Sequence, residues 1–488
     1  MAKSEQIQEV NVLKDIIAHA KEYGFVYPSS EIYDGLQAVY DYGPYGVELK
    51  NNLKKLWWES MTRLHENIVG LDAAIFMHPT TWKASGHVDS FNDPMVDNKD
   101  SKKRYRADVL IEEKAAQYEL AGEIEKSKSL LSAMGKLMDA ENFESLRELM
   151  INEGITCPLS GTSNWTEIRQ FNLMFSTQVG SVADDSSTIY LRPETAQGIF
   201  VNFLNVQKTA RMKVPFGIAQ IGKAFRNEIV ARQFIFRMRE FEQMEMQFFV
   251  RPGTELEWYK EWADKRVKWH LALGIPADKI RRHDHDKLAH YANAALDIEY
   301  AFPFGNKEVE GIHSRTDFDL KSHQEYSKKK QQYFDPEINQ NYIPYVIETS
   351  IGADRLFLMT LCNAYVEQTV DGKQRTYLKF HPAVAPVKAA ILPLTKKDGL
   401  PEKAKEIVED LKYDFNIIYE DAASIGKRYT RQDLIGTPFC IAVDHQTLED
   451  NTVTIRHRDT TEQERVPISE LHQRLSQACS FRRIFEKL

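Results

Sequence analysis

The sequence predicts an α+β protein in two parts, a strand-rich region and a smaller C-terminal α/β domain. Between residues 188 and 360, apolar and polar residues alternate with a period of two, interrupted by short helical segments. After the prolines of HPAVAPV, predicted strands and helices alternate to the end of the chain, a pattern that favours a small domain with a mostly parallel sheet. With 488 residues, 42% of them hydrophobic, the chain has room for large cores.

Composition excludes several classes of protein. The 63 basic and 71 acidic residues give a formal net charge of −8, which rules out a histone-like basic coat but leaves room for a local basic patch. No segment approaches the ~18 apolar residues of a membrane span, and the N-terminus lacks the apolar core of a signal peptide. Cys157, Cys362, Cys440 and Cys479 are isolated, which argues against a zinc finger or a disulfide framework. We therefore expect a cytoplasmic protein that makes no membrane contact.

The N-terminal region is expected to form helices, a turn-rich loop and a strand. In order, the pattern predicts a helix over 11–24, a loop over 33–46, a helix over about 47–66 and a strand over 71–79 that ends at Pro79. Residues 107–152 contain many Glu, Lys, Ala, Leu and Met and no Pro. They predict two or three helices, which we interpret as an insertion into the larger domain, either a solvated decoration or a substrate-facing lid.

The C-terminal region is expected to begin after a hairpin-like segment and linker at 366–388. Its predicted elements are strands over 387–394, 415–420, 437–443 and 452–458 and helices over 400–412, 427–434 and 467–486. We therefore expect one domain over 1–385, with a helical insertion at about 86–165, and a second over 386–488.

Residues 216–250 carry the strongest chemical signal, because a strand–loop–strand pattern there combines a polar face with an apolar one. The period of two places these polar and aromatic residues on shared faces: Gln220, Arg226 and Glu228 on the first strand, and Phe241, Gln243 and Glu245 on the second. Such a face suits a nucleotide, since arginine grips phosphate, a carboxylate accepts from an exocyclic amine and phenylalanine stacks on a base. The alternative is an exposed, salt-bridged hairpin. Arg232, Arg237 and Arg239 in the loop are further candidates for phosphate or tRNA contacts.

Two other segments could contribute to the same site. In YVIETSIGADRLFLMTL, Glu348 and Ser350 share a strand face, and Arg355 lies in the first turn of a helix that starts after Gly352. Such a helix start favours anions, although a plain strand–turn–helix with a surface arginine is the alternative. In LRPETAQGIF, Glu194 sits at a predicted helix start, where a carboxylate is usually a helix-dipole partner.

Two carboxylates in NKEVEGIHSRTDFDL suggest a magnesium site. Glu308 and Glu310 alternate with Val309, so a regular strand would point both carboxylates the same way. Mg²⁺ is commonly bound by one or two carboxylates together with substrate phosphates. The alternative is exposed strand charge, which we favour for Glu310 taken alone.

Together these segments resemble the three signature motifs of class II aminoacyl-tRNA synthetases. The first is the long helix and strand ending at Pro79, the second is FRNE…REFEQME and the third is GADR. Longer blocks, including SSEIYDGLQAVYDYGPYGVELKNNL, ASGHVDSFNDPMVDN, KKRYRAD and EGIHSRTDFDL, closely resemble the homodimeric type of glycyl-tRNA synthetase. The resemblance covers nearly the whole chain and is weakest across the helical insertion.

The resemblance implies a class II catalytic domain built on an antiparallel sheet and a C-terminal α/β anticodon-binding domain. It implies an ATP-dependent ligase that joins glycine to the 3′ end of tRNA(Gly) through glycyl-adenylate, with Mg²⁺, as a homodimer. Arg226 would hold the α-phosphate, Arg355 the γ-phosphate, Glu228 the adenine amine and Phe241 the base, while Glu308 would help hold Mg²⁺. The glycine ammonium would be bound by Glu194, Glu348 and Ser350, with Glu245 and either Arg104 or Arg106 close by.

The full sets implied by the resemblance are contiguous with these motifs. Catalysis is assigned to Arg226 and Arg355. The ATP-binding residues are Arg226, Asn227, Glu228, Phe236, Arg237, Met238, Arg239, Glu240, Phe241, Glu308, Val309, Gly352, Ala353, Asp354 and Arg355. The glycine-binding residues are Arg106, Glu194, Phe241, Glu242, Gln243, Met244, Glu245, Glu348, Thr349, Ser350, Ile351 and Gly352. Arg428, Tyr429, Arg431 and Phe439 are candidate anticodon readers, although a core role for Phe439 is favoured.

Three positions depart from the family pattern. Thr349 stands where the family often has proline, and Asp34 and Ala38 replace expected glycines. Two alternative identities are a synthetase of the same subgroup for threonine, proline or serine, and a catalytically inactive, synthetase-like binding subunit. The cysteine pattern lacks the zinc ligands expected for threonine, and Arg226 and Arg355 are the motif arginines that inactive relatives typically lose. Since every competing amino acid is larger than glycine, no editing domain is expected.

Overall fold

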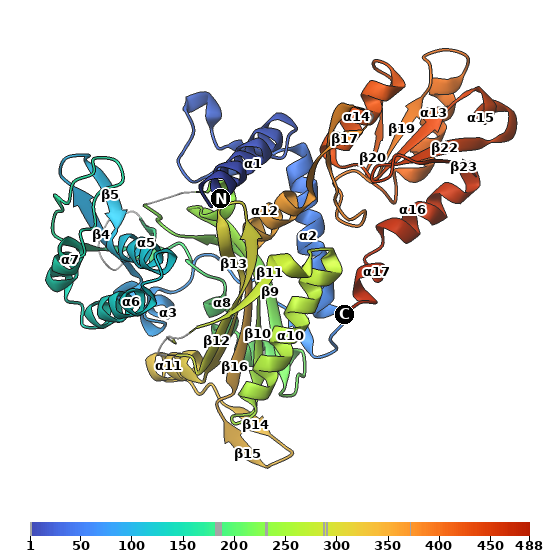
Figure 1. The fold of residues 1–488 in the computed structure, drawn as a ribbon. Helices are drawn as coiled ribbons and strands as arrows, with labels where there is room; N and C mark the ends of the chain where they lie inside the picture. Colours follow the sequence, from blue (N-terminus) through green and yellow to red (C-terminus); the bar gives the residue numbers. More distant parts are fainter. Residues whose placement is uncertain (1, 181–187, 230–232, 286–287, 289–290, 371) are drawn as a thin grey trace.

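A seven-stranded sheet forms the centre of the larger part of the molecule (Figure 1). The computed structural model describes residues 2–180, 188–229, 233–285, 288, 291–370 and 372–488. In spatial order the strands are β11 (Ile280–Asp284), β12 (Ala294–Phe302), β13 (Gly305–Thr316), β16 (Tyr345–Gly352), β10 (Glu240–Val250), β9 (Phe216–Phe225) and β3 (Ile68–Gly70). All neighbours pair antiparallel except β3 with β9. The antiparallel sheet implied by the resemblance is therefore confirmed.

Alternation along the strands separates an apolar face from a polar one. On β10, Met244, Met246 and Phe248 are almost fully buried in the main core. That face is covered by the helices α2 (Pro44–Thr62), α10 (Glu255–Leu273) and α12 (Ala353–Ala364) (Figure 1). The helices thus leave the opposite face of the sheet to the polar side chains predicted for it.

The N-terminal elements match the sequence pattern in part. The predicted helix is α1 (Ala2–Glu22), and the predicted loop contains η1 (Glu31–Tyr33) and a short strand, β2 (Tyr40–Tyr42), which pairs with β1 (Val26–Pro28). The prediction of a strand over 71–79 is wrong, because the strand is β3 and ends at Gly70. Beyond it Leu71 N–H still donates to Ala219 O of β9 (2.9 Å), but at Ala73 the bonds go to side chains: Ala73 N–H donates to Gln220 (2.8 Å), and Arg192 donates to Ala73 O (2.7 Å).

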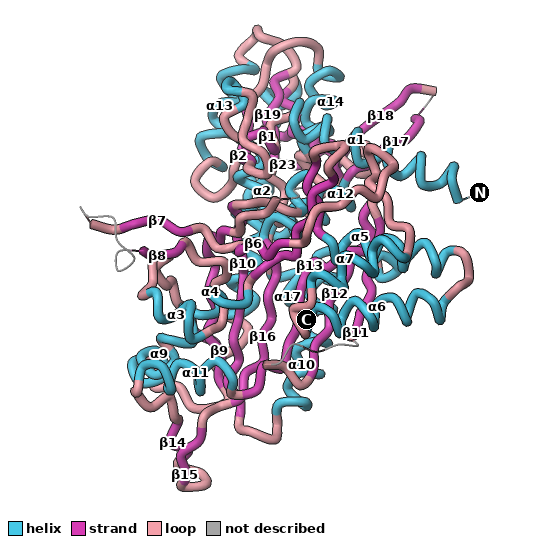
Figure 2. The backbone as a smooth tube through the Cα atoms, turned by 90° about the vertical axis from the view of Figure 1, so that its left-hand side faces the viewer, coloured by secondary structure: helices cyan, strands magenta, loops and turns pink. Residues whose placement is uncertain are grey.

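The insertion folds around a core of its own. Its helices are α5 (Ala107–Leu120), α6 (Ile124–Asp139) and α7 (Phe143–Asn152), which confirms the prediction of helices in this region. They pack against a three-stranded sheet of β5 (Lys103–Arg106), β4 (Asn92–Asn98) and β6 (Arg169–Asn172), with Ile111, Leu146 and Trp165 buried between them. The insertion lies on the side of the central sheet away from α10 (Figures 1 and 2).

Shorter elements complete the larger part. These are α3 (Pro79–Ala84), α4 (His87–Ser90), β7 (Ser176–Gln178), β8 (Thr188–Tyr190), α8 (Ala196–Val201), α9 (Phe203–Thr209), η3 (Phe234–Phe236), η4 (Ala277–Lys279), α11 (Phe318–Ser327), β14 (Tyr333–Asp335) and β15 (Gln340–Tyr342). The predicted hairpin before the linker is β17 (Tyr365–Val370) with β18 (Lys373–Leu378).

The C-terminal domain is α/β, but its sheet is mixed and not mostly parallel as predicted. The strand order is β20 (Ile417–Tyr419), β19 (Ala389–Pro393), β21 (Phe439–Val443), β22 (Thr452–His457) and β23 (Gln463–Pro467). β19 pairs parallel with β20 and β21, whereas β21–β22 and β22–β23 are antiparallel. The connections on either side of β22 are too short for the crossover of a dozen or more residues that parallel pairing requires.

Helices pack on this sheet and end the chain. They are α13 (Leu400–Leu411), α14 (Ile425–Ile435), α15 (His445–Asp450), α16 (Leu471–Cys479) and α17 (Arg482–Phe485), with a 3₁₀ turn, η5 (Ile468–Glu470), before α16. The single last helix predicted over 467–486 is therefore divided, because Ser480 adopts an extended conformation. Among the described helices, none combines the length and apolarity needed to cross a bilayer.

Candidate active site

The polar face of the central sheet opens into a cavity of about 240 Å³. The predicted site residues that line it are Glu194, Arg226, Glu228, Phe236, Arg237, Met238, Phe241, Gln243, Glu245, Glu308, Glu348, Ser350, Gly352, Asp354 and Arg355. They come from β10, β13, β16, the start of α12 and the segments around them. The prediction that Gln220, Arg226 and Glu228 share a face of the first strand is wrong, because β9 ends at Phe225 and Gln220 does not line the cavity. Antiparallel pairing of β10 with β16, with Glu245 opposite Ser350 and Gln247 opposite Glu348, brings two distant motifs together.

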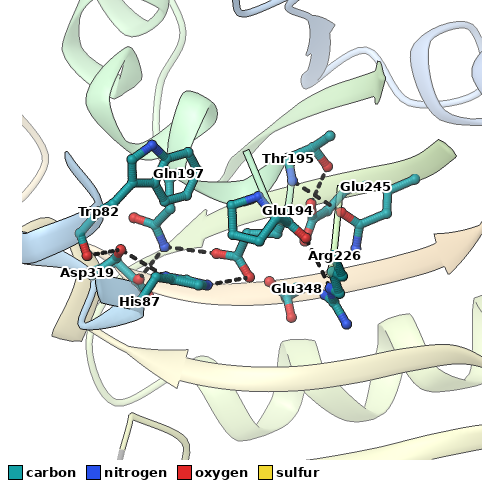
Figure 3. Close-up of polar contacts among 12 residues, drawn as sticks. Trp82, His87, Glu194, Thr195, Gln197, Arg226, Glu245, Asp319 and Glu348 are labelled. Atoms are coloured by element: carbon teal, nitrogen blue, oxygen red, sulfur yellow. Dashed lines mark hydrogen bonds and ion pairs between the residues drawn. The ribbon is translucent and has the colours of Figure 1, made fainter. Parts of the chain in front are cut away.

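Three carboxyl groups meet at one end of this cavity: those of Glu194, Glu245 and Glu348 (Figure 3). Glu348 accepts hydrogen bonds from His313 Nδ1 (3.0 Å), Arg315 Nη1 (3.1 Å) and Gln247 Nε2 (2.7 Å). The site therefore concentrates negative charge where a small cation could bind. Side chains from two other strands, β10 and β13, orient the Glu348 carboxylate.

The other two carboxyl groups have partners of their own. Glu194 lies 3.4 Å from His87 Nε2 and accepts from Gln197 Nε2 at 3.0 Å. Glu245 accepts from the hydroxyl of Thr195, the residue next to Glu194 in the chain. The segment after β8 thus ties two of the three carboxyl groups together (Figure 3).

These carboxyl groups differ in pKa because their partners differ. Burial opposes the charge of Glu348, but the Arg315 guanidinium and the hydrogen bond from His313 outweigh it and lower the pKa of Glu348. Burial likewise opposes the charge of Glu194, but His87 outweighs it and lowers the pKa of Glu194 to about 2. Glu245 has no such cation, so burial and the charges of Glu348 and Glu194 raise its pKa well above the usual value. Two carboxyl groups with lowered pKa values therefore lie beside one with a raised pKa.

Sequence reasoning missed several residues of this end of the cavity. Tyr291, His313 and Arg315 line it, and Arg315 also binds Asp319 through Nε (2.8 Å) and Nη2 (3.0 Å). His313 and Arg315 lie two residues apart on one face of β13, inside the quoted block EGIHSRTDFDL. Strand periodicity on that block was the available signal, but Glu348, which binds both side chains, lies on β16, 33 to 35 residues further along the chain.

Arginines and aromatic rings line the other end of the cavity. The Arg226 guanidinium lies 5.3 Å from the ring centres of both Phe91 and Phe241, and its Nε donates to Pro193 O (3.0 Å). The Arg355 guanidinium lies 4.4 Å from the ring of Phe236. An arginine held beside an aromatic ring in this way is oriented to bind the phosphates of a nucleotide whose planar base stacks nearby.

The expectation that Glu308 and Glu310 face the same way is wrong. Glu308 lies on the cavity side, 2.8 Å from Arg355 Nη1, and that guanidinium lowers its pKa. Glu310 is fully buried on the opposite face, bound to Arg266 and His270 of α10. The physical cause is a β-bulge: Ile298 and Glu299 of β12 oppose Glu310 and Glu308, so Val309 is an extra residue.

A magnesium ion would therefore meet one carboxylate of this pair. Among the described residues, no group of three or more His, Cys, Asp or Glu is arranged to hold a metal without other ligands. A single carboxylate still fits Mg²⁺, because this ion commonly takes one or two protein carboxylates and completes its shell with water and substrate phosphates.

Several predicted residues lie outside the cavity lining. Met244, Val309, Ile351 and Ala353 belong to the main core, and Thr349 is buried between strands. Glu240 pairs with Lys223, Glu242 with Lys50 and Lys54, and Arg239 donates to backbone carbonyls of Glu228 and Gln37. Asn227 bonds through its backbone N–H to Leu173. Some of these residues alternate with lining residues along a strand, and the others lie beside the lining.

Neither candidate arginine of the KKRYRAD block lines this cavity. Arg104 is half-exposed and pairs with Asp97. Arg106 pairs with Asp93 (3.0 Å) and Asp108 (2.6 Å) and lines a second cavity of about 440 Å³ beside α5. That cavity shares Phe236 and Arg237 with the first, so Arg106 lies next to the site rather than inside it.

The candidate anticodon readers differ in accessibility. Arg428 is buried and donates to the backbone carbonyls of Pro393 and Glu420. Phe439 packs on the C-terminal core, as favoured from the sequence, while Tyr429 is partly buried. Arg431 remains half-exposed while paired with Glu420. Arg232 lies outside the described residues.

Comparison with protein families defines the class of protein. Residues 176–364 match the tRNA synthetase class II core domain (G, H, P, S and T), and residues 388–478 match the anticodon-binding domain. Residues 93–131 and 120–173 match the glycyl-tRNA synthetase insertion domain 1. The fold, with its core and anticodon-binding domains, is that of a class II tRNA synthetase.

Curated relatives narrow the class to a family. The chain is 57% identical over 461 residues to glycine–tRNA ligase of Chlorobaculum tepidum, covering 94% of this chain and 98% of the relative. It is 54% identical to that of Macrococcus caseolyticus, covering 96% and 99%, and 53% identical to that of Staphylococcus aureus, covering 96% and 98%. The chain belongs to the glycine–tRNA ligase family.

Proposed function

We propose that this protein is a glycine–tRNA ligase that activates glycine with ATP and transfers the glycyl group to the 3′ end of tRNA(Gly). The observation that carries the proposal is that buried carboxyl groups line one end of a cavity and arginines line the other. In charge, a substrate with an ammonium group matches the carboxyl end, and a nucleoside triphosphate matches the arginine end. The family membership supports the same reaction.

The glycine ammonium is assigned to the charged carboxylates Glu194 and Glu348, with Ser350 beside them. Arg315 and His313 support the placement by keeping Glu348 charged and oriented. Glu245, whose pKa is raised by burial and by its carboxylate neighbours, forms a wall close to the amino acid. Selection of glycine is steric, since a larger amino acid must fit its side chain among buried residues.

The nucleotide is assigned to the opposite end. Arg226 binds the α-phosphate and Arg355 the γ-phosphate, Glu228 accepts from the adenine amine and Phe241 stacks on the base. The remaining predicted ATP residues around these four form the walls and backbone of this end. Glu308 would hold Mg²⁺, which supplies charge neutralisation at the phosphates when bound.

Adenylate formation then needs positioning and charge neutralisation rather than a protein nucleophile. The glycine carboxylate attacks the α-phosphorus in line, the bond to the β-phosphate oxygen breaks, and pyrophosphate leaves. Arg226 stabilises the charge that develops on the α-phosphate. The tRNA 3′ hydroxyl next attacks the glycyl carbonyl, and AMP leaves.

The proposal includes domain roles and assembly. Residues 1–385, with an insertion at about 86–165, form the catalytic domain, and 386–488 read the anticodon. A separate core built from residues between Ala389 and Leu475 supports this division, while Ile484 of α17 packs back into the main core. We propose a cytoplasmic homodimer, consistent with the motif resemblance of α2. The exposed apolar side chains of Ile32, Tyr33 and Leu36 support a protein interface near the N-terminus. Light scattering on the purified protein would give the oligomeric state.

Glycine-dependent ATP–pyrophosphate exchange without tRNA, measured across all twenty amino acids, tests the function. We expect exchange with glycine alone. Arg226→Ala should reduce it by at least about 100-fold, the loss typical of removing a charge-stabilising donor, while the fold persists. Arg282→Ala is a matched control, because Arg282 is an exposed arginine of β11 paired with Asp264 outside the cavity. Exchange with another amino acid would overturn the glycine assignment, and no exchange at all would favour an inactive binding subunit.

A further inference from the structure

The β-bulge in β13 decides which carboxylate reaches the active-site cavity. Glu310, Ile312 and Ser314 are fully buried on the face covered by α10, whereas Gly311, His313 and Arg315 line the cavity. A regular strand would place Glu308 with Glu310 under α10. The extra residue, Val309, shifts the alternation of side chains between the two faces by one residue, so Glu308 lies on the cavity face instead.

A buried charged cluster lies on the far side of the sheet at this point. Glu310 accepts from Arg266 Nε (2.5 Å) and Nη2 (3.3 Å) and from His270 Nε2 (2.8 Å). Both partners belong to α10, and all three side chains are almost fully excluded from solvent. The Arg266 guanidinium also packs 4.6 Å from the ring of Trp269, so its orientation is constrained on two sides.

We propose that this Glu310–Arg266–His270 cluster is a positioning device for the nucleotide end of the active site: it holds the bulge at Val309 and thereby keeps Glu308 beside Arg355. The inference rests on the proposed function only in giving Glu308 a role with ATP and Mg²⁺. Glu310, Arg266 and His270 touch no substrate and act through Glu308.

The physical reason is that a buried carboxylate is stable only with its partners. With Arg266 in place, Glu310 forms a bidentate ion pair with it by facing α10. Without it, an unpaired charge in the core favours a register in which position 310 turns toward the polar cavity. That change would displace the bulge and shift the backbone at Glu308, which loosens its contacts with Arg355; Arg355 now binds both the Glu308 carboxylate (2.8 Å) and its backbone carbonyl (3.2 Å).

The test is the kinetics of Arg266→Met in ATP–pyrophosphate exchange, measured below its melting temperature. We expect kcat/KM for ATP to fall by about 10- to 100-fold, as small misplacements at an active site do, with the KM for glycine within about twofold. Adding Glu310→Leu should restore the ATP kinetics, because an apolar residue favours the core face without a cation. If Arg266→Met does not fold, Arg266→Lys takes its place with the same expected direction.

Two comparisons separate positioning from general stability. Leu273→Ala removes a buried side chain of the same helix and core and should lower the melting temperature without changing the ATP kinetics. In a Glu308→Gln background, Arg266→Met should change kcat/KM for ATP by less than about twofold, because the two residues act through one route.

The outcomes distinguish the inference from the function. If Glu308→Gln weakens ATP use but Arg266→Met does not, or if the two effects multiply, the positioning role is wrong and the function stands. If Glu308→Gln leaves the ATP and Mg²⁺ dependence unchanged, both the role of Glu308 and the inference fall. Absence of glycine-dependent exchange in the unmodified protein would overturn the proposed function itself.

Discussion

Replacing Glu348 with glutamine tests the glycine site most directly. Glutamine keeps the shape of the side chain but removes the charge that His313, Arg315 and Gln247 hold in place. A hydrogen bond to a charged group contributes about 1.5–3 kcal/mol, and each 1.36 kcal/mol is a factor of ten. Loss of one such bond to the ammonium therefore predicts a KM for glycine raised by about 10- to 150-fold.

The fold should survive this change, because Arg315 retains its two hydrogen bonds to Asp319. Exchange is measured as a function of glycine at saturating ATP, and then of ATP at saturating glycine. Asp335→Asn is a matched control, since Asp335 is a buried carboxylate of β14, outside the cavity, and is paired with Arg251 (2.7 Å). An unchanged KM for glycine in folded Glu348→Gln, or an equal rise in Asp335→Asn, would refute the reasoning.

Two further predictions concern pH and stability. Folding raises the pKa of Glu245 above its usual value of 4.5, so burial of its carboxyl group lowers the free energy of unfolding as the pH rises above 4.5 but not below it. Melting curves should therefore show Glu245→Gln more stable than the unmodified protein at pH 8 and equal to it near pH 4. The reverse order would contradict this. Lys50 binds Asp354 (2.7 Å) and Glu242 (2.9 Å) in a buried network between α2 and α12. Breaking a buried pair costs about 3–5 kcal/mol, so calorimetry on Lys50→Met should show a clearly lower melting temperature of the catalytic domain, and an unchanged one would show that the network is not stabilising.

Local patterns predicted much of the central sheet correctly. The alternation of Met244 and Met246 with Gln243 and Glu245 follows from strand geometry alone, so both faces of β10 were assigned before any tertiary contact was known. The helix start after Gly352 was equally local. The motif blocks indicated the family, which the relatives confirm.

Local patterns failed where pairing between distant segments decides the outcome. Periodicity extended the strand to residue 79, but at Ala73 the side chains of Gln220 and Arg192 take the backbone bonds that strand pairing would make. The same reasoning predicted a mostly parallel C-terminal sheet, although short connections impose antiparallel pairing around β22. Both errors concern which partner a segment meets, information that a periodic pattern does not contain.

The sequence by itself thus determined the class of protein, the apolar and polar faces of the strands, and the presence of carboxylates and arginines suited to glycine and ATP. Only the tertiary structure decided which carboxylates meet. Glu308 and Glu310 are indistinguishable by spacing, yet the bulge at Val309 sends one to the cavity and the other to Arg266. The pKa values of Glu245 and Glu348 likewise shift in opposite directions, because among the described residues a cation from another element lies beside Glu348 and not beside Glu245. Backbone geometry repeats along the chain, whereas these contacts join residues far apart in it.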